Sequence, residues 1–115
     1  MKIYSHKTCN SCKKAIKWLA ERGLDVEHVA IADTPPSIEE LKQALASGYT
    51  LKALFNTSGL EYRGRDMKNL LPTMSEDEAL ELLSCVGMLV KRPFLVADSV
   101  ALVGFKEDAW ETALS

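Results

Sequence analysis

The chain has 115 residues, of which 47% are apolar and 26% are charged, and its 14 basic and 16 acidic residues give a net charge of −2. A chain of this length buries roughly two-thirds of its unfolded surface on folding, which is enough for one hydrophobic core without a metal ion or a disulfide. The charge balance argues against direct nucleic-acid binding, and no apolar stretch is long enough for a membrane span or a signal segment. We therefore expect a single domain over residues 1–115, monomeric and cytoplasmic.

The three cysteines are too few and too unevenly spaced for the disulfide framework of a small secreted protein. Cys9 and Cys12 form a C-x-x-C pair, whereas Cys85 lies alone far along the chain. In a reducing compartment such a pair is typical of a redox-active or metal-binding site. The elements that surround the pair decide between these roles.

The first third of the chain predicts a βαβ unit. Residues 2–5 are a short strand candidate, and apolar positions at helical spacing from Cys12 to Leu19 predict a helix that ends at Gly23. The β-branched residues in 26–31 predict a second strand. Because the crossover should be right-handed, the two strands are expected to be parallel.

The middle of the chain predicts helices. Capping boxes at Ser37–Glu40 and Ser75–Glu78 each open a helix, and the second helix is expected to end near Gly87. Cys85 lies on the apolar stripe of that second helix, which predicts a buried, structural cysteine. The segment 62–69 is polar and basic and predicts a loop.

The last part of the chain predicts a ββα unit. Residues 94–97 and 100–103, joined by a short turn, predict an antiparallel hairpin, and residues 107–114 predict a helix. This helix is expected to pack through Ala109, Trp110 and Ala113. The order of elements predicts an α/β protein with a thioredoxin-like fold, in which the βαβ and ββα units share a four-stranded mixed sheet and residues 35–88 form a helical insertion.

The position of Cys9 before a predicted helix gives the pair its chemistry. Unpaired amide groups and the positive end of the helix dipole favour a thiolate there, and Lys7, Lys13 and Lys14 add positive potential. Cys12, one turn later, is within reach to resolve a mixed disulfide. We therefore predict that Cys9 is the nucleophile, that Cys12 is the resolving thiol, and that Lys13 contacts the substrate.

Two alternatives remain for the pair. It can be a buried and inert structural pair, or His6, Cys9 and Cys12 can bind zinc. A closed zinc site needs a fourth ligand, for which only Cys85 or His28 remains, and neither has a second ligand at short spacing. The prediction is therefore no metal.

Basic residues elsewhere suggest anion binding. Arg92 precedes Pro93, a position at which the peptide bond can be cis, and in the predicted fold this corner lies opposite the cysteine turn. A guanidinium there can hold an oxyanion or a carboxylate through paired hydrogen bonds, although an ordinary surface arginine is the alternative. Arg63, Arg65 and Lys68 form a second basic cluster, either a solvated loop or an anion-binding or partner-binding rim.

Five segments together resemble the ArsC/Spx family, in order and over essentially the whole chain: Thr8–Ala15, Pro35–Ser37, Lys52–Thr57, Lys91–Pro93 and Val103–Phe105. The resemblance implies a thioredoxin-like fold with a helical insertion. It also implies that Cys9 matches the nucleophilic cysteine of arsenate reductases and that Arg92 matches the oxyanion-holding arginine before a cis-proline.

This chain differs from arsenate reductases at three positions. Those enzymes carry arginines at the position of Asn56 and near Gly104, and they commonly lack the second cysteine that Cys12 provides. The resemblance implies a thiol-dependent oxidoreductase that acts on a small oxyanion or a thiol or disulfide substrate. We expect Asn56, Arg63 and Pro93 to bind that substrate.

The expected reductant of such an enzyme is glutathione, a glutaredoxin or a thioredoxin, with no bound cofactor. The alternative is an Spx-like redox-sensing regulator that binds the α subunit of RNA polymerase.

Overall fold

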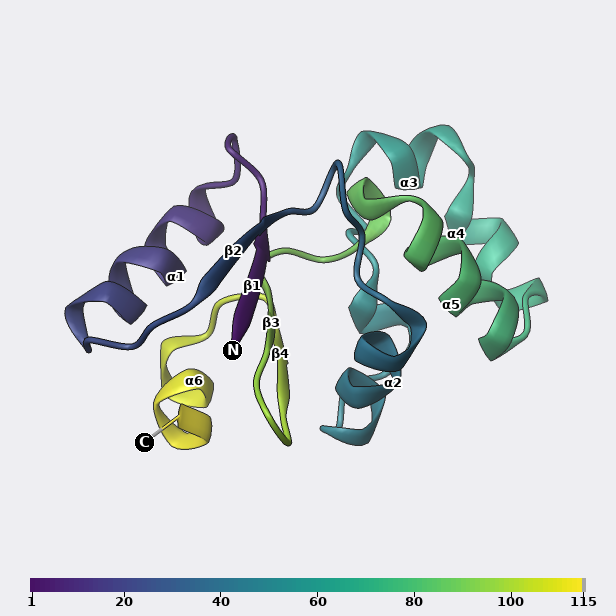
Figure 1. Cartoon of the computed structure of the whole chain (residues 1–115). Coiled ribbons are helices and arrows are strands. Elements are labelled where there is room, and N and C mark those ends of the chain that lie inside the picture. Colours follow the sequence, from purple (N-terminus) through teal and green to yellow (C-terminus); the bar gives the residue numbers. More distant parts are fainter. Residues whose placement is uncertain (115) are drawn as a thin grey trace.

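A computed structural model describes residues 1–114 and shows a four-stranded mixed sheet with helices on both faces (Figure 1). The strands are β1 (Lys2–Ser5), β2 (Glu27–Ala30), β3 (Phe94–Val96) and β4 (Ala101–Val103), in the order β2-β1-β3-β4. Strands β1 and β2 are parallel, whereas β1–β3 and β3–β4 are antiparallel. The predicted fold class, with a βαβ unit and a ββα unit in one sheet, is therefore confirmed.

The helices divide between the two faces of the sheet (Figure 1). Helices α1 (Asn10–Glu21) and α6 (Glu107–Leu114) cover one face, and the segment between β2 and β3 covers the other. That segment contains four α-helices and three short 3₁₀ helices: α2 (Ile38–Ala46), η1 (Lys52–Leu54), α3 (Leu60–Gly64), α4 (Met67–Leu70), η2 (Leu71–Thr73), α5 (Glu76–Cys85) and η3 (Gly87–Leu89).

Alternation along the strands supplies both cores. Ile3 pairs with Leu95 and Leu95 pairs with Leu102, and all three side chains lie on the α1 and α6 face, where they pack with Trp18 and Trp110. Their neighbours along the strands point the other way, into a larger core shared with α2 and α5; these are Tyr4, Phe94, Ala101 and Val103. Both tryptophans are therefore core residues.

Helix α1 places the C-x-x-C pair at one edge of the sheet. The helix starts directly after Cys9, buries a stripe that includes Cys12, Ala15 and Leu19, and is followed by Gly23 at φ +67°. A positive φ favours glycine because it has no Cβ, which explains why the helix ends there. Both capping boxes are also present, at the starts of α2 and α5.

Three local predictions are wrong. Residues 62–69 are not a loop, because Tyr62 and Met67 are buried and anchor the short helices α3 and α4. Cys85 is exposed, because the buried face of α5 runs through Ala79, Leu80 and Leu83. Cys85 comes two residues after Leu83 and therefore lies on the opposite side of the helix. In α6 only Trp110 is buried, whereas Ala109 and Ala113 face solvent.

Within residues 1–114, the helices all fall short of the length and hydropathy needed to cross a membrane.

Candidate functional site

The sheet brings two loops to the same edge. Tyr4 near the end of β1 lies opposite Phe94 at the start of the antiparallel strand β3. The loop that leads from β1 to Cys9 therefore lies next to the Arg92–Pro93 peptide, which is cis. Pro93 is buried, and its carbonyl accepts a hydrogen bond from Gly104 N at 2.8 Å. The predicted juxtaposition of the cysteine turn and the Arg92 corner follows from this register.

Cys9 is the N-cap residue of α1. Its backbone is extended, at φ −91° and ψ 109°, and its Sγ accepts a hydrogen bond from Cys12 N at 3.2 Å. A tight turn holds it, since Cys9 N donates to His6 O at 3.1 Å and His6 Nδ1 lies 2.8 Å from Thr8 Oγ1. The side chain of Cys9 is half-buried. The sulfur therefore lies where a helix presents unpaired amide groups and where a substrate can still approach.

Cys12 has a different environment, although it is only one turn away. It is 1% exposed, and burial, together with the hydrogen bond to the Cys9 side chain, raises the pKa of the Cys12 thiol to about 12. A hydrogen bond from the His6 backbone and the positive charge of Arg92 oppose this shift. Cys12 is therefore a neutral thiol at physiological pH.

Arg92 is half-buried and poorly satisfied by the protein. Its Nη1 makes two long contacts with Met88, 3.4 Å to the carbonyl oxygen and 3.8 Å to Sδ, and within residues 1–114 its buried Nε has no hydrogen-bond partner. Buried N–H groups are nearly always paired, so this guanidinium has hydrogen-bonding capacity that the protein does not use. Arg92 lines a cavity of about 360 Å³ together with Asn56, Leu60 and Met88. We call this space the Arg92 cavity.

The structure brings some of the predicted site residues together and separates others. Asn56 lies with Arg92 in the Arg92 cavity. Lys13 lies with Cys12 and His6 in a second cavity, of about 640 Å³, that extends along the exposed edge strand β2. Arg63, on α3, is exposed and lines neither cavity. Asn56 therefore lies beside Arg92, whereas Arg63 is an exposed residue outside both cavities.

Four residues of the Arg92 cavity were not predicted, namely Gly59, Leu60, Glu61 and Met88. Leu60 is 82% exposed, the largest exposed fraction among the large apolar residues described, and Met88 contacts the guanidinium through both its carbonyl and its sulfur. The only signal for Leu60 in the sequence is its place after the Asn56–Gly59 turn. No sequence signal marks Met88, because its position depends on the fold of η3.

The zinc alternative finds no site in the described chain. Within residues 1–114, His, Cys, Asp and Glu side chains nowhere gather in groups of three or more that could hold a metal ion. All three cysteines are free thiols.

A model of the ArsC family matches residues 4–113, which is nearly the whole chain. The chain is 49% identical over 110 residues to Uncharacterized protein YusI of Bacillus subtilis, a match that covers 95% of this chain and 93% of that protein. The crystal structure of an ArsC family related protein from Bacteroides fragilis superimposes with a TM-score of 0.88 at 41% identity, covering 96% of both chains. The chain therefore belongs to the ArsC family.

Relatives with functional names fall into two groups. An arsenate reductase of Neisseria meningitidis is 29% identical over 109 residues, covering 90% of this chain and 89% of that protein. The global transcriptional regulator Spx of Enterococcus faecalis is also 29% identical, over 107 residues, covering 92% of this chain and 80% of that protein. The family thus includes both reductases and regulators, and this chain is about equally similar to each.

Proposed function

We propose that this protein is a thiol-dependent oxidoreductase in which Cys9 is the nucleophile and Cys12 resolves the mixed disulfide. The observation that carries the proposal is the contrast between the two thiols. Cys9 is half-buried at the N-terminus of α1 and accepts an N–H at 3.2 Å, whereas Cys12 is buried directly behind it. An attacking thiol must be accessible, and a resolving thiol needs only to reach the first sulfur.

With a disulfide substrate the electrons balance in two steps. Cys9 Sγ attacks one substrate sulfur, which forms a mixed disulfide and releases the other half as a thiol. Cys12, after it loses its proton, attacks Cys9 Sγ, which releases the second thiol and leaves a Cys9–Cys12 disulfide. The substrate has then gained two electrons. Glutathione, a glutaredoxin or a thioredoxin, abundant in the cytoplasm where we expect the protein, returns two electrons to the pair.

Arg92 supplies the anion-binding part of the site in this proposal. Its unpaired Nε and loosely held Nη1 can donate to an oxyanion or to a carboxylate of a thiol cosubstrate, with Asn56 beside it in the Arg92 cavity. Lys13 lies in the cavity on the β2 side and contributes positive charge near Cys12. The buried Pro93 holds the backbone next to the pair.

Turnover of a small disulfide and of arsenate, with glutathione as reductant, tests this proposal. Cys9→Ser should abolish turnover, because no other accessible thiol lies at the site. Cys12→Ser should retain part of the activity, because glutathione can resolve the mixed disulfide in place of Cys12. Cys85→Ser is the matched control and should match the wild type, since Cys85 is exposed at the end of α5. Equal turnover in the wild type and in Cys9→Ser would refute the proposal that the protein is a Cys9-dependent oxidoreductase.

The second candidate is a redox-sensing regulator, supported by the similarity to Spx and by the presence of both cysteines. In this case the Cys9–Cys12 disulfide would change the affinity for the α subunit of RNA polymerase. Pull-down of purified α subunit with the reduced and the oxidised protein tests it. A redox-dependent difference in binding supports the regulator, and failure of both forms to bind excludes it.

A further inference from the structure

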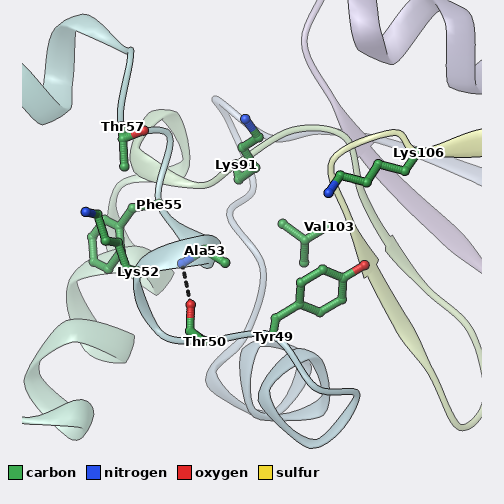
Figure 2. A pocket seen from close by; sticks show the side chains of 9 residues that line it. All are labelled: Tyr49, Thr50, Lys52, Ala53, Phe55, Thr57, Lys91, Val103 and Lys106. Carbon is green, nitrogen blue, oxygen red and sulfur yellow. Dashed lines mark hydrogen bonds between the residues drawn. The ribbon is translucent and has the colours of Figure 1, made fainter. Parts of the chain in front are cut away.

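A cavity of about 490 Å³ lies between η1 and the β3–β4 hairpin, and three lysines line it (Figure 2). We call it the lysine cavity; its lining includes Tyr49, Lys52, Thr57, Lys91, Val103 and Lys106. Its volume falls within the range of about 300–1,000 Å³ that is typical of small-molecule sites. None of these residues belongs to the predicted catalytic set.

The lysine cavity is separate from the Arg92 cavity, although residues that line one are next in the sequence to residues that line the other. Segments 54–56 and 89–91 run side by side, joined by hydrogen bonds from Asn56 N to Leu89 O at 2.7 Å and from Lys91 N to Leu54 O at 2.8 Å. Side chains of an extended segment alternate between its two sides. Asn56 and Arg92 therefore line one cavity, and Lys91, with Thr57, lines the other.

The charge of the lysine cavity is uncompensated. No carboxylate lines it, and the ion pairs found within residues 1–114 involve Lys2, Arg22 and Arg65 rather than Lys52, Lys91 or Lys106. Figure 2 shows the Lys52 ammonium on the far side of the cavity, pointing away, whereas Lys91 and Lys106 lie on the same side. A multiply charged anion between Lys91 and Lys106 would offset their mutual repulsion. This local charge is in contrast to the net charge of −2 of the whole chain.

The backbone around the cavity is held in place. Gly104, at φ +70°, leaves open the space beside Lys91, whose Cε would lie 3.5 Å from a Cβ at that position. Trp110 fixes this turn, since its Nε1 donates to Gly104 O at 2.9 Å and its backbone N donates to Lys106 O at 3.0 Å. The attachment points of the lysines are therefore preorganised, which lowers the entropic cost of binding.

We propose that the lysine cavity binds a diphosphate group, either as free pyrophosphate or as part of a nucleoside diphosphate. Lysine ammonium groups bind phosphate as point charges, and a diphosphate concentrates several negative charges in a space that Lys91 and Lys106 can flank. Val103 and the Tyr49 ring form an apolar wall beside Lys106 in Figure 2, against which a nucleoside can pack.

Isothermal titration at low ionic strength tests the proposal. The protein carries Cys9→Ser, so that the result is independent of thiol chemistry and of the proposed function. Pyrophosphate and ADP are titrated separately; tighter binding of ADP identifies a nucleoside diphosphate as the ligand, and equal binding identifies the free diphosphate. Lys91→Gln and Lys106→Gln should each weaken binding about tenfold. Added salt should weaken it further, because the attraction is electrostatic.

A matched variant locates the site. Lys68→Gln, which removes an exposed lysine of α4 outside the cavity, should bind as the parent does. The proposal is overturned if the parent binds neither probe, if Lys91→Gln and Lys106→Gln bind as well as the parent, or if Lys68→Gln weakens binding as much as they do.

Discussion

Cys9 and Cys12 are three residues apart in sequence but have opposite environments. The phase of helix α1 causes the difference: Cys9 precedes the helix as its N-cap, whereas Cys12 lies on the stripe that buries Ala15 and Leu19. The reactivity of a cysteine depends on its access and on its thiolate fraction, and Cys12 has neither at neutral pH because its pKa is raised to about 12. This contrast assigns the two roles in the proposed mechanism.

Alkylation with iodoacetamide at neutral pH should follow this contrast. Cys9 and Cys85 are accessible and should be modified, whereas Cys12 is buried and protonated and should react at least about tenfold more slowly. Fragmentation of the peptide that contains both Cys9 and Cys12 in a mass spectrometer locates the label. In urea all three cysteines should react. Modification of Cys12 as fast as Cys9 in the folded protein would contradict the assignment.

Single-residue predictions succeed where a residue has a fixed relation to an element end. Cys9 at the start of a helix and Arg92 before a proline at a strand end lie where the sequence places them. Cys85 fails, because an apolar stripe allows a small error in phase and the sequence gives no other signal for the buried face of α5. Arg63 is basic in the sequence, but whether it faces a cavity depends on how α3 packs.

Among the helical elements, η3 depends on one glycine. A Cβ on Gly87 would lie 1.8 Å from Ile31 O, the backbone of the segment that follows β2. A real Cβ never comes so close to a backbone oxygen, so one of the two segments would have to move. Because η3 leads into Arg92, this contact also positions the start of β3.

Gly87→Ala should therefore lower the free energy of unfolding by about 3 kcal/mol, at the upper end of overpacking effects. Gly64→Ala is the matched control, since nothing lies within 4 Å of its added Cβ and its φ is ordinary. It should leave the protein unchanged or stabilise it by about 0.5 kcal/mol. Urea unfolding followed by circular dichroism measures both. Equal stability of the two variants would refute the close packing of η3 on residue 31.

The sequence predicts the long elements better than the short ones. Both capping boxes mark their helices correctly because the Ser and Glu side chains act on the backbone locally. Helices α3 and α4 have five and four residues, which is too short for propensity alone to form a helix. They exist because Tyr62 and Met67 are buried in the core, and that contact is not visible in the local sequence.

At the scale of the whole molecule, one polar cluster ties the sheet to the helical segment. Tyr4 Oη donates to Glu40 Oε1 at 2.6 Å, and Lys2 Nζ lies 3.0 Å from Glu40 Oε2. Burial alone would raise the pKa of Glu40, but the hydrogen bonds from Tyr4 and Ser37 and the charge of Lys2 lower it overall. Strand β1 is thereby connected to the start of α2.

Glu40→Gln should destabilise the protein at neutral pH by about 1–2 kcal/mol, because it removes the charge that these donors face. Since the pKa of Glu40 is lower when folded than when unfolded, its contribution is complete above the ordinary value of 4.5 and is lost as the pH falls through the lower, folded value. The difference in stability between wild type and variant should therefore shrink below pH 4.5. Urea titrations at several pH values measure it, and a difference that is independent of pH would contradict this account.

The overall arrangement follows from the order of elements, but the cavities do not. A right-handed βαβ crossover and a short hairpin turn leave few ways to build the sheet, so its topology is predictable. The Arg92 cavity and the lysine cavity join residues around position 56 to residues around positions 91 and 104. Such neighbours meet only after the helical segment has packed, and no pattern along the chain predicts their distance.

The central claim is that Cys9 attacks and Cys12 resolves, and trapping of the mixed disulfide tests it most directly. Glutathione disulfide is added to the reduced wild type, Cys9→Ser and Cys12→Ser, and the intact proteins and their peptides are weighed by mass spectrometry. Cys12→Ser should accumulate one glutathione on Cys9. The wild type should form a Cys9–Cys12 disulfide without retained glutathione. In Cys9→Ser, Cys12 should carry no glutathione and form no disulfide. An adduct on Cys12 in Cys9→Ser, or no adduct on Cys9 in Cys12→Ser, would contradict the account.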